Sequence, residues 1–281
     1  MIGKIVASIG QVRKQAGVSS DIIEVVAVGV PGPLDTARGV IRFAPNLGWR
    51  DVPLKRILEE QISMKVILDN DANLAALGEH IFGVGRGQEN MVYVTVSTGV
   101  GGGLILGGRL YRGSSDGAGE IGHITVQPEG PLCTCGARGC LEAVSSGTAI
   151  AREARCLVER GGGQNILAQA GGNPAGISAA VVAAAAAGGD PEAGSIISLA
   201  ARFLGIGVAS IINLLNPGMV VLGGGVMEIG EPIWRHVRLE VEARALETSR
   251  TRAQIVPAGL GRRAGVLGAV ALALALALQQ K

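Results

Sequence analysis

Residues 120–142 read E-I-G-H-I-T-V-Q-P-E-G-P-L-C-T-C-G-A-R-G-C-L-E, a glycine-rich stretch with one histidine and three cysteines. The cysteines follow C-x-C-x4-C spacing, and the histidine lies ten residues before the first cysteine. Three thiolates and an imidazole are the tetrahedral donor set of a structural zinc site, and Gly136 and Gly139 allow the tight turns that such a site needs. The predicted ligands are His123, Cys133, Cys135 and Cys140. The alternative is a group of ordinary buried thiols, because free cysteine behaves as a small hydrophobic residue.

Several motifs together resemble those of one protein family. E-I-G-H followed by C-T-C-G-A-R-G-C-L-E resembles the signature of the ROK family, which comprises bacterial sugar kinases and related repressors. A-P-N-L-G-W at 44–49 resembles the family's sugar-binding loop, and D-N-D-A-N at 69–73 resembles its catalytic motif. S-T-G-V-G-G-G at 97–103 and L-G-G-G-V at 222–226 resemble its phosphate and adenosine loops. The motifs occur in the family's order along essentially the whole chain, which strengthens the zinc prediction.

The composition is that of a globular, loop-rich protein, since 48% of the 281 residues are hydrophobic and 45 are glycine. This length accommodates one large domain or two modest ones. The net charge of +2 comes from 25 basic and 23 acidic residues without a basic block. This charge distribution argues against a nucleic-acid partner.

Neither terminal segment predicts a membrane anchor. Apolar residues in 2–12 recur on one helical face and basic residues interrupt them, unlike a signal peptide. The apolar run 265–278 is shorter than the roughly 20 residues that span a membrane, and its alanines and leucines favour a helix, so we expect a buried helix. We therefore expect a cytoplasmic protein without a membrane partner, in which four cysteines favour metal binding over disulfides. Cys156 lies outside the cluster and is predicted to be a core residue.

Hydrophobic patterns and glycine or proline breaks predict alternating helices and strands. In the first third we expect an opening helix that ends near Gly17, strands at 25–30 and 66–68, and helices at 53–60 and 72–80. A hairpin of 91–97 and 102–106, a short strand in 219–226, and helices at 178–187, 191–215 and 234–246 are expected to follow. This βαβ rhythm indicates an α/β layer fold, which binds ligands at strand ends.

The family resemblance implies a two-lobed, actin-like ATPase fold of the ribonuclease H-like type. The small lobe would comprise residues 1–88, completed by the C-terminal helix 265–281, and the large lobe with the zinc site would comprise 89–264. In the family a D-x-G-G-T strand opens the small lobe and supplies a phosphate loop and an aspartate for Mg²⁺. This sequence contains no such motif. We therefore expect an N-terminally truncated small lobe and impaired phosphoryl transfer.

Asp71, the second aspartate of D-N-D, matches the general base of the family's kinases. Phosphoryl transfer to a sugar hydroxyl uses a carboxylate that accepts the hydroxyl proton. From the residues alone, a helix N-cap is the more ordinary role for an aspartate at this position. The resemblance favours the general base.

Other residues at matching motif positions would bind a hexose together with Asp71. They are Asn46, Asn70, Glu120, His123 and Glu142. Convergent polar groups of this kind discriminate between sugars, because a buried group left unpaired is costly. The resemblance gives His123 two roles, with one ring nitrogen on zinc and the other toward the sugar, so that zinc would organise the pocket. The alternative for the glutamates is a solvated surface charge.

Two glycine-rich turns would hold ATP and its Mg²⁺. Backbone N–H groups of the first turn and the hydroxyl of its threonine would contact phosphates, and the second turn would pass close to the adenosine. The residues concerned are Thr98, Gly99, Gly101, Gly223, Gly224 and Gly225. Each turn alone is weak evidence, because hairpins also use glycine.

The resemblance therefore implies an ATP-dependent hexose kinase that converts glucose to glucose 6-phosphate. H-I-T-V-x-P together with C-x-C-G-x-x-G-C-L-E resembles the glucokinases more than the fructokinase branch, while N-acetylmannosamine and N-acetylglucosamine kinases share most of it. The alternative is a non-catalytic sugar-binding member of the family, either a pseudokinase or a regulator-like sensor. The family resemblance also implies a homodimer or homotetramer.

Overall fold

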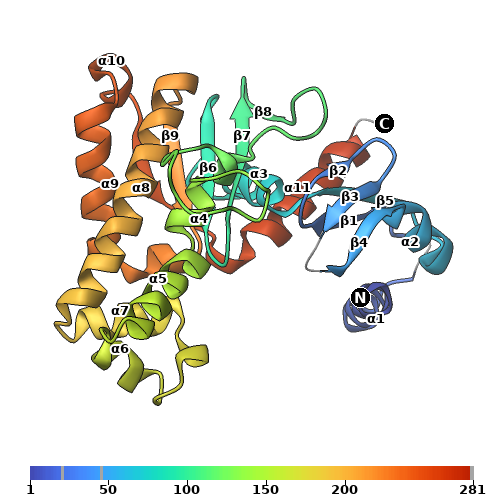
Figure 1. Ribbon diagram of the computed structural model, residues 1–281. Coiled ribbons are helices and arrows are strands. Elements are labelled where there is room, and N and C mark those ends of the chain that lie inside the picture. The colour runs from blue at the N-terminus through green and yellow to red at the C-terminus, as the bar shows by residue number, and fades with distance from the viewer. Residues whose placement is uncertain (20–21, 45–46, 279–281) are drawn as a thin grey trace.

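The computed structural model describes residues 1–19, 22–44 and 47–278, and its helices and strands form two groups (Figure 1). The N-terminal group contains these elements: α1 (Ile2–Ala16), β1 (Val26–Val30), β2 (Leu34–Asp35), β3 (Val40–Ala44), β4 (Trp49–Val52), α2 (Leu54–Ile62) and β5 (Val66–Asn70). β1 and β5 pair in parallel, with Val26 opposite Val66 and Val30 opposite Asn70. β2, β3 and β4 form an antiparallel sheet. The buried residues of both sheets and of α2 share one hydrophobic core.

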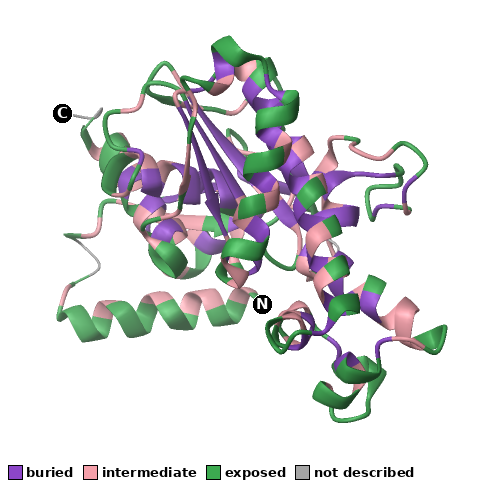
Figure 2. Cartoon of the chain, turned by 90° about the vertical axis from the view of Figure 1, so that its left-hand side faces the viewer, coloured by how far each residue is buried: buried purple, intermediate pink, exposed green. Residues whose placement is uncertain are grey.

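The C-terminal group is built on a five-stranded sheet with the order β10-β9-β6-β7-β8. Its strands are β6 (Met91–Val96), β7 (Val100–Leu106), β8 (Arg109–Tyr111), β9 (Met219–Gly223) and β10 (Gln254–Pro257). Its helices are α4 (Leu141–Ser145), α5 (Gly147–Glu159), α6 (Gln164–Gln169), α7 (Ala179–Ala187), α8 (Pro191–Leu215), α9 (Glu231–Arg244) and α10 (Glu247–Arg250). Figure 2 shows the buried strands of this sheet in purple, with helices on either side.

The strands of the large sheet bury side chains on both faces, because successive residues of a strand point in opposite directions. Val92 and Val94 of β6 belong to the larger core, which includes residues of α5, α7, α8 and α9. Met91 and Tyr93 of the same strand belong to a second core, which includes Ala76 of α3 (Asp71–Phe82). α3 therefore begins at the end of β5, in the two-stranded sheet of the N-terminal group, and packs against the five-stranded sheet.

α3 also packs along α11 (Ala264–Leu278), the last helix of the described chain. The two backbones approach closely at Gly268, where a Cβ atom would overlap with the carbonyl of Leu74. α11 in turn contacts β1. These two helices connect the two groups of elements.

Most of the elements predicted from the sequence are confirmed. The opening helix ends at Gly17 in a left-handed conformation with φ 65°, the hairpin of β6 and β7 forms, and α8 has the predicted bounds 191–215. The strands β2, β3, β4, β8 and β10 and the helices α4, α5, α6 and α10 were not predicted. Most of them are only two to six residues long, so tertiary contacts decide them. α5 is longer and amphipathic, with Ala149, Ile150 and Ala154 buried, so its pattern was present in the sequence and was missed.

The prediction of a buried C-terminal helix is wrong. Only small residues of α11 are buried, namely Ala264, Gly268 and Ala271, because close packing on α3 leaves no room for larger ones. The larger side chains are exposed or half-buried, and Val266 is 69% and Leu274 is 53% exposed. By length and hydropathy, α8 and the segment Gly261–Leu278 resemble membrane-crossing helices. The most apolar part of α8 is 56% buried within the protein, whereas that of Gly261–Leu278 is 17% buried.

Candidate active site

Asp71 is the first residue of α3 and follows directly after β5. The N-cap of the helix is Asn70, whose Oδ1 accepts hydrogen bonds from the backbone N–H groups of Ala72 at 2.8 Å and Asn73 at 3.2 Å. The Asp71 carboxylate also accepts from Ala72 N at 2.9 Å. Its side chain is open to a cavity, but the cavity walls remove part of its hydration. This desolvation raises the pKa of Asp71 above the ordinary 3.8, although the Ala72 N–H opposes the shift.

A cavity of about 510 Å³ brings predicted sugar-binding residues from three parts of the chain together. Its lining includes Asn70, Asp71, Glu120, His123 and Glu142. This volume lies within the range of small-molecule sites, about 300–1,000 Å³. Asn46, the remaining predicted sugar ligand, lies outside the described residues. The structure therefore gathers the described sugar-binding candidates around Asp71.

A second cavity of about 490 Å³ shares Ser97 and Thr98 with the first. A hydrogen bond holds the backbone of Thr98 in place, because Thr148 Oγ1 donates to the Thr98 carbonyl at 2.7 Å. Gly225, which is predicted to lie near the adenosine, lines this second cavity. Gly223 and Gly224 do not line it. At Gly224, where φ is 90°, a Cβ atom would overlap with the carbonyl of Val96, so this glycine allows the turn after β9 to approach β6.

Several residues that line the second cavity were not predicted from the sequence. They come from α5, from the start of α7 and from the turn after β9: Thr148, Arg155, Ser178 and Glu228. Ser178 is the N-cap of α7, where its side chain accepts from Val181 N. Its capping position was readable from the sequence, but its place in the cavity depends on how α5 and α7 pack.

Glu142 joins the predicted phosphate turn to the cysteine-rich loop. Its Oε2 accepts from the backbone N–H of Val100 at 2.9 Å, and its Oε1 accepts from Thr134 Oγ1 at 3.5 Å. A Cβ atom at Gly99 would overlap with this carboxylate. Glu142 therefore contacts both the cavity beside Asp71 and the turn between β6 and β7.

The four predicted metal ligands lie together, with their ligand atoms all within 4.8 Å of one another. His123 Nδ1 lies 3.7 Å from Cys133 Sγ, and Cys135 Sγ lies 3.7 Å from Cys140 Sγ. A tetrahedral zinc ion with Zn–S bonds of about 2.3 Å separates its sulfur ligands by roughly 3.8 Å, so the cluster has the size of a zinc site. Cys156 lies elsewhere, half-buried on α5.

The cysteine loop depends on one glycine conformation. Gly139 has φ 67°, and a Cβ atom there would overlap with the carbonyl of Gln127. Burial raises the pKa of the Cys140 thiol to about 12, whereas the backbone N–H of Ala137 lowers the pKa of Cys135. A bound cation would lower the pKa of Cys140, since a thiol that coordinates a metal is deprotonated.

His123 presents its two ring nitrogens to different partners. Its Nδ1 lies toward Cys133, while its Nε2 lies 3.8 Å from Glu120 Oε2 at the cavity beside Asp71. The ring therefore connects the cysteine cluster to the cavity, an arrangement that suits the two predicted roles.

The sequence profile of the ROK family matches residues 3–276. The chain belongs to the ROK family. A glucokinase from Halalkalibacterium halodurans is 43% identical over 251 residues, which are 89% of this chain and 75% of that protein. A xylose repressor from Bacillus subtilis is 32% identical over 86% of this chain and 59% of that protein.

Solved ROK structures share the fold. A ROK glucokinase from Streptomyces griseus, in complex with glucose and AMPPNP, superposes with a TM-score of 0.85 at 36% identity, covering 98% of this chain and 87% of that chain. The predicted actin-like α/β architecture is thereby confirmed, since ROK sugar kinases have this fold. In this ROK protein the cleft residues therefore lie within a sugar-kinase scaffold.

Proposed function

We propose that this ROK protein transfers the γ-phosphoryl group of ATP to the 6-hydroxyl of glucose. The observation that carries the proposal is the junction of the two cavities at Ser97 and Thr98. A hexose beside Asp71 and a nucleotide in the second cavity would meet there, and positioning is the main requirement of phosphoryl transfer. The similarity to glucokinases supports glucose as the sugar.

In this mechanism Asp71 accepts the proton of the attacking hydroxyl. Its raised pKa increases the proton affinity of the carboxylate, which suits a general base better than a fully hydrated aspartate. Asn70, Glu120, His123 and Glu142 supply the donors and acceptors that hold the sugar ring. Their fixed positions would orient one hydroxyl toward Asp71.

The phosphates would lie along the turn between β6 and β7. Gly99 and Gly101 leave the backbone accessible there, and the Thr98 hydroxyl adds a donor. Mg²⁺ would arrive with ATP, and its chemistry is to neutralise phosphate charge. Gly225 and the start of α7 would surround the adenosine.

We propose a structural zinc ion in the cysteine cluster. His123, Cys133, Cys135 and Cys140 would hold it, and the size of the cluster fits. Such an ion fixes the ring orientation of its histidine ligand. The His123 Nε2 would thereby be held toward Glu120 and the sugar.

The test is a coupled assay with ATP, Mg²⁺ and a panel of sugars: glucose, fructose, xylose, N-acetylglucosamine and N-acetylmannosamine. We expect the highest kcat/KM for glucose and strict dependence on ATP. The same panel is measured by calorimetry, so that binding and transfer are separated. Transfer to another sugar at a higher kcat/KM would reassign the substrate.

A second candidate function is sugar binding without transfer. The similarity to the Bacillus subtilis xylose repressor favours it. In the same experiment, a sensor would bind a sugar calorimetrically and give no ATP-dependent product. The presence of Asp71 in the first cavity favours the kinase over the sensor.

A further inference from the structure

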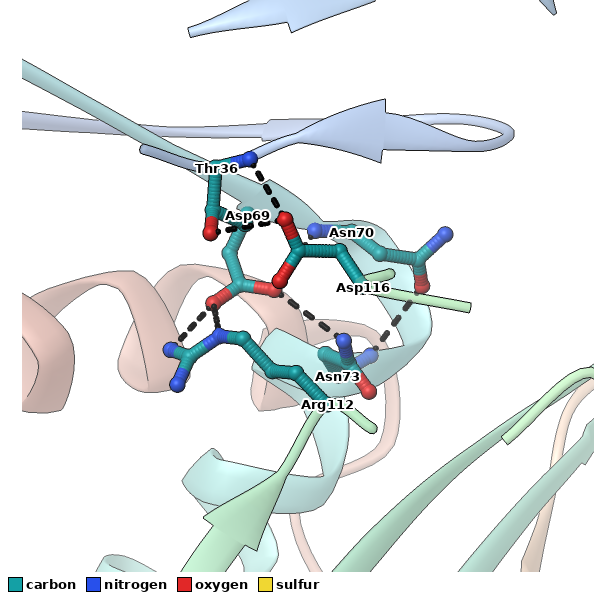
Figure 3. Close-up of polar contacts among 6 residues, drawn as sticks. All are labelled: Thr36, Asp69, Asn70, Asn73, Arg112 and Asp116. Atoms are coloured by element: carbon teal, nitrogen blue, oxygen red, sulfur yellow. Dashed lines mark hydrogen bonds and ion pairs between the residues drawn. The ribbon is translucent and has the colours of Figure 1, made fainter. Parts of the chain in front are cut away.

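A fully buried carboxylate directly precedes the Asn70–Asp71 pair. Asp69 has no exposed surface, and both of its oxygens are occupied (Figure 3). Its Oδ2 accepts from Arg112 Nε at 2.9 Å and from Arg112 Nη2 at 2.6 Å. Its Oδ1 accepts from the backbone N–H of Asn70 at 2.8 Å and from Asn73 Nδ2 at 3.1 Å. The carboxylate is thus paired with one cation and two amides.

The two amides lie on either side of Asp71. The N–H of Asn70 belongs to the last residue of β5, which caps α3, and the side chain of Asn73 belongs to the first turn of the helix. Because Asp69 binds both groups through one oxygen, it fixes the backbone that carries the Asp71 side chain. A shift of the Asp69 carboxylate would therefore move Asp71.

Arg112 lies in the loop after the last residue of β8, at the edge of the large sheet. It follows β8 and opens the loop 112–119, which leads to Glu120 and His123. Although 43 residues separate Arg112 from Asp69 in sequence, their ion pair joins the loop to the end of β5. Arg112 does not itself line the sugar cavity in the described chain. Its side chain reaches the reaction through Asp69, while its backbone carbonyl accepts from the N–H of Ala118 at 3.0 Å within the same loop.

The same loop is held at a second point. Asp116 Oδ2 accepts from the backbone N–H of Thr36 at 2.8 Å and from Thr36 Oγ1 at 3.0 Å (Figure 3). Asp116 has φ 59°, a left-handed conformation that few non-glycine residues adopt. Two contacts with the N-terminal group therefore fix the loop that precedes the sugar-binding residues.

We infer that Arg112 is a positioning residue for phosphoryl transfer, because its ion pair with Asp69 sets the place of Asp71 relative to Glu120 and His123. The inference rests on the proposed kinase function and names a residue that acts on it from outside the cavity. Misplacing a reacting group by about 1 Å costs up to 10²-fold in rate. Loss of Arg112 is therefore expected to lower kcat far more than glucose affinity.

The experiment compares Arg112→Lys and Arg112→Met with the wild-type chain. Arg202→Met serves as the matched control, because Arg202 pairs with Glu240 between α8 and α9, away from the cleft. Measurements are kcat, KM, calorimetric glucose affinity and Tm. For Arg112→Met we expect kcat to fall roughly 30-fold or more with glucose affinity within about threefold. Arg112→Lys keeps the positive charge but not the two guanidinium contacts with Asp69, so it should recover part of kcat. Arg202→Met should match the wild type.

Three results would overturn the inference. One is a folded Arg112→Met variant with wild-type kcat while the wild type phosphorylates glucose, which leaves the proposed function intact. Another is a loss of glucose affinity as large as the loss of kcat, since general loosening of the fold would act on both. If the wild type transfers no phosphate, the proposed function fails, and hydrogen exchange decides the inference. Amides of residues 70–73 must then exchange faster in Arg112→Met than in Arg202→Met, and equal exchange overturns it.

Discussion

The carboxylate of Glu79 accepts a hydrogen bond from the backbone N–H of Leu260 at 2.8 Å, across 181 residues of sequence. Its other oxygen accepts from the N–H of Val84 at 3.2 Å. Glu79 has no exposed surface. Val84 lies just after α3 and Leu260 lies just before α11, so one buried side chain ties together the two segments at which these helices join the large sheet.

Glu79→Gln should destabilise the fold. A glutamine has one acceptor oxygen, so its amide group would face one of the two backbone N–H groups and leave it unpaired. An unsatisfied buried donor costs about 1–3 kcal/mol, and in domains of this size each kcal/mol lowers Tm by roughly 2–4 °C. The Tm of the variant, measured by thermal unfolding, should therefore lie clearly below that of the wild type. Glu89→Gln, at an exposed position in the same connection, is the control, and an equal Tm for both variants would contradict the role of Glu79.

Asp71→Asn should remove most of the catalytic rate. Loss of a general base lowers kcat by about 10² to 10⁴, whereas asparagine keeps much of the hydrogen bonding to the sugar. Coupled kinetics and calorimetric glucose titration measure the two effects separately. Asp51→Asn on exposed β4 is the matched control. If kcat fell less than tenfold, Asp71 would not be the general base.

The pH dependence of kcat should reflect the protonation of Asp71. Only the deprotonated carboxylate accepts the hydroxyl proton, and desolvation raises its pKa above the ordinary 3.8. As pH falls, Asp71 therefore protonates earlier than an exposed aspartate would, and kcat should decline with a midpoint above 3.8. Circular dichroism at each pH establishes that the chain is still folded. An acidic limb centred at 3.8 or below would rule out a desolvated base.

Removal of one cysteine ligand should release the metal. We expect the purified wild type to contain about one zinc per chain, in keeping with a four-ligand structural site. Cys135→Ala should abolish it and weaken glucose binding, because the ion holds the loop that carries Glu142 and the ring of His123. Metal analysis and calorimetry are the measurements. Cys156→Ala, outside the cluster, should keep the zinc, and a metal-free wild type would refute the site.

Gly99→Ala should weaken glucose binding through Glu142. The added Cβ atom would overlap with the Glu142 carboxylate and displace it from the Val100 N–H. A hydrogen bond to a charged group is worth about 1.5–3 kcal/mol, so KM for glucose should rise roughly tenfold or more. The control is Gly194→Ala in α8, where nothing lies within 4 Å of an added Cβ. Equal KM values for both variants would show that the Glu142 carboxylate can move aside without loss of glucose binding.

The sequence determined features whose causes are local. Proline, glycine and apolar periodicity placed the bounds of α8 and the end of α1 at Gly17, because these signals act within a few residues. The spacing of the cysteines and His123 predicted that these four side chains lie together, and they do, since most of them share one loop. The motif order along the chain then identified the family and its fold.

Tertiary structure alone decided which distant groups meet. The Asp69–Arg112 pair, the Glu79–Leu260 bond and the junction of the two cavities at Thr98 all join segments far apart in sequence. No local pattern encodes such partners, because they depend on how sheets and helices pack. The exposure of α11 has the same origin: its composition predicted burial, but close packing at Gly268 buries only its small residues. Local propensity sets an element, and the space left by its neighbours decides which face is buried.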